Sequence, residues 1–528
     1  MPGADKFFIT TAIYYPNNRP HIGTAFEIIG TDVQARFRHM QGHPVFFLTG
    51  NDEHTVKVAR RAAELGIDPK TYVDDMARLF KDVWAGLDIA YDGFIQTSED
   101  RHKEGCRRFI QRVYDAGDIY RGPYEGLYCE GCESFKSDRD LVDGRCPNHP
   151  TQELKRVRET NYFFALSKYR DRLLKWYEDH PNFIWPRTRR NEITSLVEGG
   201  LQDVSISRQG IEWGIPVPFD PAQTIYVWFD ALLNYITGIG YGTDDNEFAR
   251  WWPADVHVIG KDITRFHCAL WPAMLMSAGL EPPRQVVVHG FIYHKGEKVS
   301  KSLGNVVDPM ELVERYGSDA FRYFLLRECP FGGDGDFSYD RFVNVYNADL
   351  ANNLGNLYSR TLTMCQRYFG GRLEGSRAFE PREVFAEIDL TAVVQRTREQ
   401  VESCSYNEAL ATIWQQVLDS ANRYVEHTKP FALAKTDLAS CKVVLVNLVE
   451  ALRVAAILIK PFMPRASAWI HGGFNFSEPF DRVSFAGVAG RPPQSEDLRI
   501  TAALDSQGKV APLFPRIQTQ SKLAPVAG

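Results

Sequence analysis

The chain has 528 residues, of which 44 % are hydrophobic and 24 % are charged, and its formal net charge at pH 7 is −6. This composition is typical of a globular protein of three or four domains and excludes an intrinsically disordered chain. The charge also excludes a uniformly basic surface for nucleic acid, although a local basic face could still bind one.

The first 117 residues alternate strand and helix patterns. Residues 6–13 and 44–50 are apolar runs typical of buried strands, and residues 22–40 and 55–65 carry apolar side chains at helical spacing. Strand–helix–strand–helix order predicts a doubly wound parallel sheet of the Rossmann type. We expect residues 1–117 to form the first half of such an α/β domain.

Residues 118–222 differ in character, because they hold a cysteine cluster, many charged residues and short β-like pieces. We expect them to form an insertion in the sheet domain. The α/β pattern returns at residues 224–231 and 256–260 and continues with a helix over 266–278 and a strand over 285–290. Residues 223–290 are therefore expected to complete the sheet.

The rest of the chain is divided into three parts. Residues 291–345 follow the sheet and contain a loop rich in lysine and serine. Residues 346–490 are almost wholly helical in pattern and predict an antiparallel bundle. Residues 491–528 form a tail with little pattern.

Two segments suit phosphate. His21-Ile22-Gly23-Thr24 lies where a loop enters a helix, and a helix N-terminus with a close glycine favours an anion. A helix start that happens to contain histidine remains an equally good interpretation of this segment alone. The second segment is KVSKS, a mobile cationic clamp for polyphosphate or, taken alone, an ordinary solvated loop. Its polar residues are Lys298, Ser300, Lys301 and Ser302.

The pair HIGT and KVSKS resembles the paired motifs of the class I aminoacyl-tRNA synthetases. Segments between and around them, among them FFLTGNDEH, VWFDALLNY and IGKDITRFHCALWPAML, resemble the methionyl-tRNA synthetases over residues 6–514. The resemblance implies an enzyme that activates L-methionine with ATP and Mg²⁺ as methionyl-adenylate. It then transfers the methionyl group to the 3′ end of tRNA(Met).

The cysteine cluster predicts a metal site. Cys129-x-x-Cys132 and Cys146-x-x-His149 match the spacing of a tetrahedral zinc knuckle. In a reducing compartment a metal is favoured over disulfides. Four protein ligands would close the site, so we expect a structural Zn²⁺ in the insertion, which corresponds to the connective peptide of the family.

The resemblance also implies a methionine pocket and a nucleotide site. Asp52 is expected to bind the α-ammonium group of methionine. Asp262 and Gly260 are expected at the ribose, with Glu27 and His289 nearby, and His21, Gly23, Thr24 and KVSKS at the phosphates. The residues expected to line the methionine side-chain slot are Ile13, Tyr15, Trp228, Ala231, Leu232, Tyr235, Ile263, Phe266 and His267.

In the helical part the resemblance implies an anticodon-binding bundle. Asn422 and Arg423 could hydrogen-bond unstacked bases, and Phe431 could stack on one. An ordinary helix surface is as good an interpretation of each residue taken singly.

The implied reaction needs no protein nucleophile, so catalysis is expected from positioning and electrostatics, with His21, Thr24, Lys298 and Lys301 as the catalytic residues. The family usually has a second histidine where this chain has Thr24. One alternative is a related ligase that passes the activated amino acid to a small acceptor. Another is a non-catalytic tRNA-binding or regulatory module.

The sequence contains neither a secretion signal nor an apolar run of the roughly 18 residues that a membrane span needs. We expect a cytoplasmic protein without a membrane partner. Because the chain ends soon after Pro515, we also expect a monomer.

Overall fold

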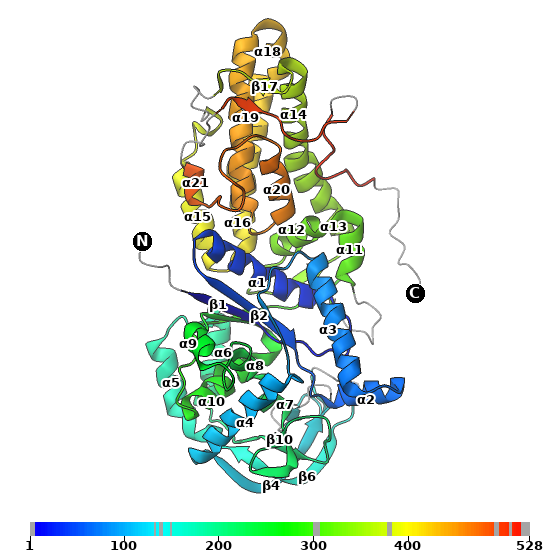
Figure 1. The fold of residues 1–528 in the computed structure, drawn as a ribbon, viewed down its shortest axis with the longest axis vertical. Coiled ribbons are helices and arrows are strands. Elements are labelled where there is room, and N and C mark those ends of the chain that lie inside the picture. Colours follow the sequence, from blue (N-terminus) through cyan, green and yellow to red (C-terminus); the bar gives the residue numbers. More distant parts are fainter. Residues whose placement is uncertain are drawn as a thin grey trace.

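The computed structural model describes residues 6–130, 134–136, 141–147, 150, 152–298, 307–376, 383–489, 496–505 and 509–518. The molecule is elongated (Figure 1). The parallel sheet lies in the middle, the helical C-terminal part extends to one end, and the insertion covers the other end.

The central sheet has six strands in the order β3-β2-β1-β12-β13-β7, and every neighbouring pair in it is parallel. This confirms the predicted doubly wound α/β fold. The order reverses between β1 and β12, which are separated in sequence by the whole insertion. The strands are β1 (Phe7–Thr11), β2 (Val45–Asn51), β3 (Gly93–Gln96), β12 (Val256–Gly260), β13 (Val286–His289) and β7 (Ile184–Trp185).

Helix α1 (Ile22–Met40) has the bounds that the sequence predicts. It is buried along most of its length because it lies between the sheet and the helical part of the chain (Figure 1). The other helices of the first half are α2 (Val56–Leu65), α3 (Pro69–Gly86) and α4 (Asp100–Asp115).

The sequence pattern fails at two places near the sheet. Residues 224–231 add no strand to it: β11 (Asp220–Ile225) joins a small antiparallel sheet with β9 (Ser207–Gln209) and β10 (Pro216–Val217), and Val227–Ala231 forms α7. The expected helix over 266–278 is divided into a π-helical turn, Phe266–Leu270, and α10 (Trp271–Ser277). Single π turns of this kind often occur at functional sites. Two short helices, α8 (Asn234–Thr237) and α9 (Asp245–Trp251), lie in sequence between α7 and this π-helical turn.

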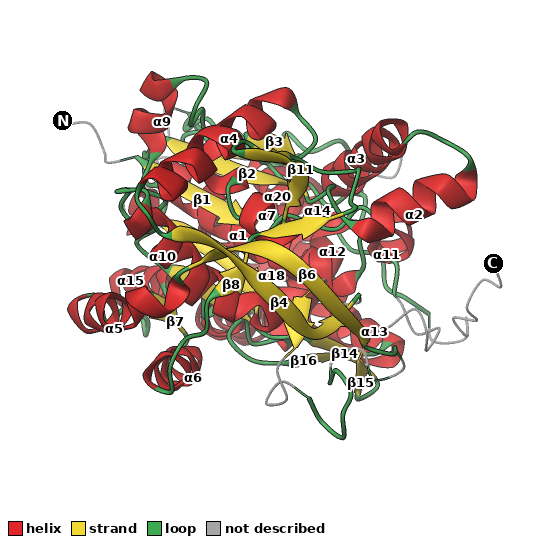
Figure 2. Cartoon of the chain, turned by 90° about the horizontal axis from the view of Figure 1, so that it is seen from below, coloured by secondary structure: helices red, strands yellow, loops and turns green. Residues whose placement is uncertain are grey.

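The insertion is built on a long antiparallel pair, β4 (Ile119–Cys129) and β6 (Lys155–Phe164), which Figure 2 shows as two curved ribbons side by side. Residues 184–185, inside the range expected for the insertion, form β7 at the edge of the central sheet. The remaining elements here are β5 (Ser134–Lys136), α5 (Arg170–Asp179), α6 (Arg187–Glu198) and β8 (Val204–Ser205).

The helical part is centred on α19 (Leu438–Ile459), whose side chains are almost all buried from Val444 onward. It is surrounded by helices with one apolar face, as in other bundles. These are α14 (Asn356–Phe369), α15 (Leu390–Glu402), α16 (Tyr406–Ile413), α17 (Asp419–Thr428), α18 (Pro430–Thr436), α20 (Pro464–Gly472) and α21 (Ala486–Ala489). A small pair, β17 (Arg372–Leu373) and β18 (Leu498–Arg499), lies beside them.

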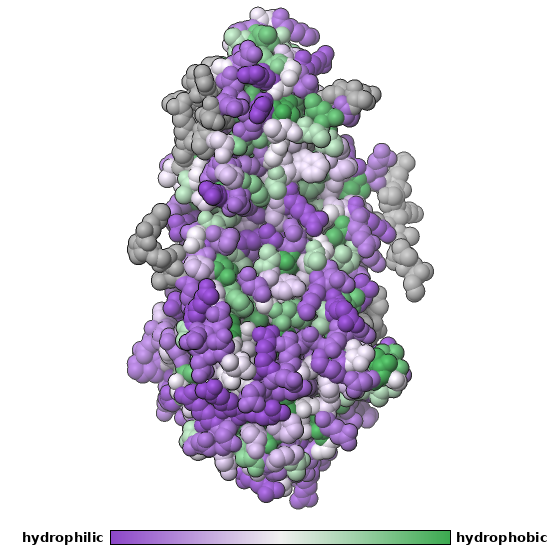
Figure 3. Space-filling model, in the orientation of Figure 1, coloured by the Kyte–Doolittle hydropathy of each residue, from purple (hydrophilic) through white to green (hydrophobic). Residues whose placement is uncertain are grey.

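A linking region joins the sheet to this bundle. It consists of β14 (Ile292–His294), β15 (Glu297–Lys298), α11 (Pro309–Tyr316), α12 (Ser318–Glu328), β16 (Gly335–Phe337), α13 (Tyr339–Val345) and a π-helical stretch, Tyr346–Gly355. The visible face of the molecule is mostly hydrophilic, with small scattered apolar patches (Figure 3). Among the described residues, every helix is too short or too polar to cross a bilayer.

Candidate active site

A cavity of about 380 Å³ opens at the carboxyl ends of β1, β2, β12 and β13. It spans the point where the strand order reverses, which is where open α/β sheets bind ligands. Sixteen of the residues singled out from the sequence line it together: Ile13, Tyr15, His21, Gly23, Thr24, Glu27, Asp52, Trp228, Ala231, Leu232, Tyr235, Gly260, Asp262, Ile263, His267 and His289.

His21 is the N-cap of α1. Its Nδ1 accepts hydrogen bonds from the backbone N–H groups of Gly23 at 3.0 Å and Thr24 at 3.4 Å. A neutral ring that accepts at Nδ1 carries its hydrogen on Nε2, which can donate to a phosphoryl oxygen. A Cβ on Gly23 would lie 3.0 Å from the His21 ring, so glycine allows this cap.

The first backbone N–H groups of a helix are usually available to an anion, but those at this helix start already have partners within the protein. The N–H groups of Gly23 and Thr24 bind His21, and that of Ile22 donates to the Val307 carbonyl at 3.2 Å. The positive end of the helix dipole remains. Contacts to an anion would therefore come from side chains around the helix start.

The start of α1 also contacts residues 307–308, which come a few positions after KVSKS in the sequence. Besides the bond from Ile22 to Val307, the Arg19 Nε lies 3.7 Å from Asp308 Oδ2. Lys298 ends β15, and Ser300, Lys301 and Ser302 lie outside the described residues. Val307 and Asp308, which follow KVSKS in the sequence, thus lie against the start of α1 and the loop before it.

The side of the cavity at the ends of β12 and β13 carries an acidic residue, Asp262, and a buried hydrogen-bonded pair. A Cβ at Gly260 would lie 2.8 Å from Asp262 Oδ1, so glycine permits that carboxylate to fold over the end of β12. His289 Nε2 lies 2.7 Å from Glu27 Oε2. Burial lowers the pKa of His289, but the hydrogen bond and charge of Glu27 outweigh it and raise that pKa above its ordinary value.

The other side of the cavity is aromatic. Trp228 lines it, and Phe266 stacks face to face on Trp228, with ring centroids 3.9 Å apart. Phe266, which was expected in the slot from the sequence, supports Trp228 and is not itself among the lining residues. His267 Nδ1 lies 3.1 Å from the Ile263 carbonyl and so donates to it, which leaves Nε2 to accept from the Tyr235 hydroxyl at 2.7 Å. Burial lowers the pKa of His267 to about 4, so the ring is neutral near pH 7. Two polar groups that satisfy each other leave a slot suited to an apolar, polarizable side chain.

Asp52 follows β2 and is buried at the floor of the cavity. Its backbone N–H donates to the Tyr14 carbonyl at 2.9 Å, which attaches this residue to the segment that follows β1. A buried carboxylate at this point can bind a ligand ammonium group.

Several lining residues escaped the sequence interpretation. Arg19 is the most consequential, because it brings a guanidinium to the cavity beside His21 and the start of α1. Its position two residues before His21, in the loop between β1 and α1, was the available signal. The other additional lining residues are Ala12, Tyr14, Asn17, Asn18, Pro20, Phe80, Asn234, Gly290, Phe291 and Ile292.

Two of the four predicted zinc ligands are described. Cys129 at the end of β4 and Cys146 are both buried and neither forms a disulfide among the described residues, whereas the neighbouring residues 142–145 are exposed. Buried thiols in an otherwise exposed segment fit soft zinc ligands. Cys132 and His149 lie outside the described residues.

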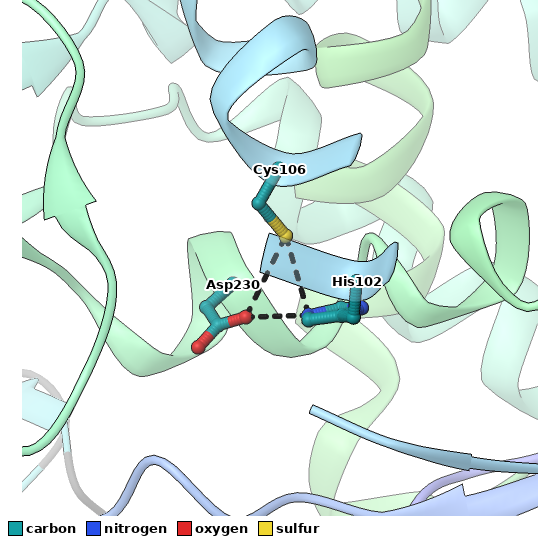
Figure 4. Close-up of side chains that lie close together, drawn as sticks. All are labelled: His102, Cys106 and Asp230. Carbon is teal, nitrogen blue, oxygen red and sulfur yellow. Dashed lines mark hydrogen bonds and ion pairs between the residues drawn. The ribbon is translucent and has the colours of Figure 1, made fainter. Parts of the chain in front are cut away.

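A second group of metal-ligating residue types lies near the sheet, where His102 and Cys106 on α4 face Asp230 on α7 (Figure 4). His102 Nε2 is 2.7 Å from Asp230 Oδ1 and 3.2 Å from Cys106 Sγ. Ligands of a tetrahedral zinc ion, with bonds of about 2.0–2.3 Å, lie roughly 3.3 Å or more apart. These contacts are therefore hydrogen bonds that leave no room for an ion.

The helical part holds the three residues expected at an anticodon. Phe431 is half-exposed and lines a groove of about 270 Å³ with Ser359, Arg360, Thr363 and Met364. Asn422 Nδ2 donates to Asn353 Oδ1 at 2.7 Å, and Arg423 donates to the Ser420 hydroxyl. Of the three residues, only Phe431 lines this groove.

Known proteins share both the motifs and the architecture. A family model described as tRNA synthetases class I (M) matches residues 7–157 and 149–362, and one described as the anticodon-binding domain of tRNA ligase matches residues 387–492. The methionine–tRNA ligase of Caldanaerobacter subterraneus is 46 % identical over 98 % of this chain and 80 % of its own length.

The chain belongs to the methionyl-tRNA synthetase family.

Other members of the methionyl-tRNA synthetase family agree with this assignment. The methionine–tRNA ligase of Thermotoga maritima is 43 % identical over 98 % of this chain and 81 % of its own. The methionyl-tRNA synthetase of Mycobacterium tuberculosis in complex with methionyl-adenylate is 41 % identical, with a TM-score of 0.89, and the alignment covers 97 % of this chain and 100 % of that one. The free form of the same synthetase gives a TM-score of 0.83, with 97 % and 98 % coverage.

Proposed function

We propose that the cavity at the carboxyl ends of β1, β2, β12 and β13 is where this methionine–tRNA ligase carries out both steps of its reaction. In the first step the carboxylate of L-methionine attacks the α-phosphorus of ATP, giving methionyl-adenylate and pyrophosphate. In the second, a terminal ribose hydroxyl of tRNA(Met) attacks the carbonyl carbon of the adenylate. The observation that carries the proposal is that one cavity holds the aromatic slot, Asp52 and the HIGT helix start.

Methionine would lie with its thioether in the slot formed by Trp228, Tyr235 and His267. Because Tyr235 and His267 satisfy each other, a side chain that needs hydrogen bonds gains none there, and a thioether loses none. Asp52 would bind the α-ammonium group and so direct the methionine carboxylate toward the nucleotide.

ATP would lie across the ends of β12 and β13. Asp262 would accept hydrogen bonds from the ribose, beside the pair Glu27–His289. His21 Nε2, the Thr24 hydroxyl and Arg19 would face the phosphates, and Mg²⁺ would accompany them. Lys298 and Lys301, together with Ser300 and Ser302, would close on the pyrophosphate. No protein nucleophile is needed, because alignment and stabilisation of the phosphorus centre supply the catalysis.

A structural zinc ion would be held by Cys129, Cys132, Cys146 and His149. The buried thiols of Cys129 and Cys146 support this assignment. A site with four protein ligands has no open position, so the ion would shape the tip of the β4–β6 hairpin and take no part in the reaction.

The groove between α14 and α18 is the place we propose for an anticodon base. Phe431 offers a half-exposed ring for stacking, and Arg360 offers donors for a base edge or a phosphate. Asn422 and Arg423 would assist from α17 if their present hydrogen bonds rearranged on binding. We also propose that the protein acts as a monomer in the cytoplasm.

A ligase that serves a small acceptor has no need of a bundle for anticodons, and the match of residues 387–492 to an anticodon-binding model disfavours that alternative. A crystal structure of the chain with a non-hydrolysable methionyl-adenylate analogue tests the site directly. We expect the ammonium group at Asp52, the thioether against Tyr235 and the ribose at Asp262. Density for the analogue in any other place would contradict the proposed site.

A further inference from the structure

The turn that carries Asp52, defined here as residues 51–54, is held in place by hydrogen bonds to neighbouring segments. On one side, the Tyr14 carbonyl accepts hydrogen bonds from Asn51 Nδ2 at 3.2 Å and from the Asp52 N–H at 2.9 Å. On the other side, the Glu53 N–H donates to Thr97 Oγ1 at 2.8 Å. The turn is therefore held between the end of β1 and the end of β3.

Glu53 extends this attachment in two directions. Its carboxylate accepts from Gln96 Nε2 at 2.9 Å and from the Ser98 N–H at 3.3 Å, and burial raises its pKa. Its carbonyl accepts from Trp213 Nε1 at 2.7 Å. Trp213 belongs to a loop of the insertion, so the turn is connected to that part of the fold as well.

The last residue of the turn reaches a buried carboxylate. His54 Nδ1 lies 2.7 Å from Asp230 Oδ2, and His102 Nε2 lies 2.7 Å from Asp230 Oδ1 (Figure 4 shows the second contact). His102 Nδ1 in turn lies 2.7 Å from the Thr237 hydroxyl. The side chains of His54, Asp230 and His102 are at most 2 % exposed.

Asp230 occupies α7 between two residues that line the cavity, Trp228 and Ala231. Burial raises the pKa of Asp230, but His54 and His102 outweigh it and hold that pKa well below its ordinary value, so the group is a carboxylate. A buried carboxylate oxygen is costly to leave without a hydrogen bond, so separation of α7 from His54 would leave Asp230 Oδ2 without the contact that His54 makes. The wall of the methionine slot and the turn with Asp52 therefore move together.

We propose that Asp230, bound between His54 and His102, is a positioning residue for methionine: it fixes the Asp52 carboxylate relative to the thioether slot. The proposal rests on the proposed role of Asp52 as the ammonium partner. Asp230 touches no reacting atom itself. Its contribution is geometric, because a displacement of about 1 Å at a binding group can cost on the order of 10²-fold in activity.

The test compares Asp230→Asn, Asp52→Asn and the double variant in methionine-dependent ATP–pyrophosphate exchange, with the full-length chain. We expect Asp230→Asn to raise KM for methionine between roughly 10- and 100-fold and to leave KM for ATP within about twofold. If Asp230 acts through Asp52, the double variant has the same KM for methionine as Asp52→Asn alone. If KM for methionine in the double variant rises by the product of the two single effects, Asp230 acts independently of Asp52, and the proposal is overturned.

Trp213→Phe is a second variant that tests the same proposal in case Asp230→Asn does not fold. The Trp213 ring lies 5.5 Å from the His54 ring between centroids; the variant keeps a smaller aromatic ring there and removes the donor to the Glu53 carbonyl. We expect a rise of roughly threefold in KM for methionine alone. His471→Gln is the control for loss of a buried histidine, because His471 packs in the bundle against Phe476 and Phe480 and its loss should leave KM for methionine unchanged.

The outcomes separate this proposal from the proposed function. An unchanged KM for methionine in Asp52→Asn would remove the role of Asp52 and the positioning role with it. If Asp52→Asn raises that KM while Asp230→Asn and Trp213→Phe do not, only the positioning role fails. Equal changes in KM for ATP and for methionine would show a general structural effect and would also overturn it.

Discussion

Arg322 Nη2 donates to Asp32 Oδ2 at 2.6 Å, and both side chains are fully buried. Asp32 lies in the middle of α1, the helix that begins at His21. Arg322 lies on α12 and also donates from Nε to the Phe462 carbonyl, in the turn between α19 and α20. Through this ion pair and the bond to Phe462, Arg322 joins α1 to the helical part of the chain.

Removing this guanidinium should weaken the whole fold. Arg322→Met leaves Asp32 buried with only Arg36 as an ionic partner, and we expect a loss of about 3–5 kcal/mol in the free energy of unfolding. Urea titration followed by circular dichroism measures it. The control is Arg465→Ala, because Arg465 forms a partly exposed pair with Asp88 that should contribute less than about 1 kcal/mol. Equal losses in the two variants would refute the special role of the buried pair.

The hydrogen bond between Tyr235 and His267 should matter for methionine alone. Tyr235→Phe leaves His267 Nε2 buried without its donor, and we expect a cost of about 1–2 kcal/mol, or roughly 5- to 30-fold in KM for methionine. Steady-state exchange kinetics with methionine and with ATP give the two constants. Tyr406→Phe removes a comparable buried bond, to the Gly30 carbonyl at 2.8 Å, and should leave KM for methionine as it is. A Tyr235→Phe enzyme with unaltered methionine kinetics would contradict the proposed slot.

We expect KM for methionine to stay constant across the pH range in which an exposed histidine takes up its proton. Burial lowers the pKa of His267 from about 6.5 to about 4. The ring thus stays neutral and keeps accepting from Tyr235 down to about pH 5. The associated stability is present above about pH 6.5 and is lost as the pH falls toward 4, because the unfolded chain takes up the proton first. We expect a constant KM for methionine between about pH 8 and 5.5; a rise with a midpoint near 6.5 would argue for an ordinary, exposed His267.

Thr24 is expected to contribute a hydrogen bond to the phosphates during adenylate formation. Thr24→Ala should lower kcat of pyrophosphate exchange by roughly 10-fold or more, with little change in KM for methionine. Thr24→Ser keeps the hydroxyl and should retain most of the rate. A Thr24→Ala enzyme as fast as the parent would assign the phosphate contacts to His21 and Arg19 without Thr24.

The two cysteine groups should differ in metal content. Cys146→Ser should lose zinc measured by atomic absorption, from one ion per chain to less than half, because thiolates are the stronger ligands. Cys106→Ser should retain the full amount, since Cys106 belongs to the hydrogen-bonded group around Asp230. Zinc loss in Cys106→Ser with retention in Cys146→Ser would reverse the assignment.

The periodicity of apolar residues correctly predicted those helices and strands in which buried side chains recur at regular intervals. The bounds of α1 and β12 agree with the periodicity of residues 22–40 and 256–260, because one face or both faces of each are packed. The pattern gave a wrong prediction for residues 227–231, because a short helix that is buried on all sides shows the same apolar run as a buried strand. The π turn at Phe266–Leu270 interrupts a segment whose apolar pattern is that of a continuous helix, and no local pattern marks the interruption.

The candidate site was predictable as a set of residues and not as a network. Asp52, Trp228 and Asp262 could be singled out because they stand in segments that resemble the family. The contacts among His54, His102 and Asp230 join residues more than a hundred positions apart in the chain. A sequence shows that such residues are present, but only the fold shows which carboxylate each histidine meets.

The most direct test of the account is a paired assay on one preparation of the chain, measuring methionine-dependent ATP–pyrophosphate exchange and charging of tRNA(Met). We predict that both activities are present and that Asp52→Asn depresses both through KM for methionine. Exchange without charging would contradict the role of the helical part in tRNA binding. Absence of both activities would contradict the central claim that this cavity activates methionine and transfers it to tRNA.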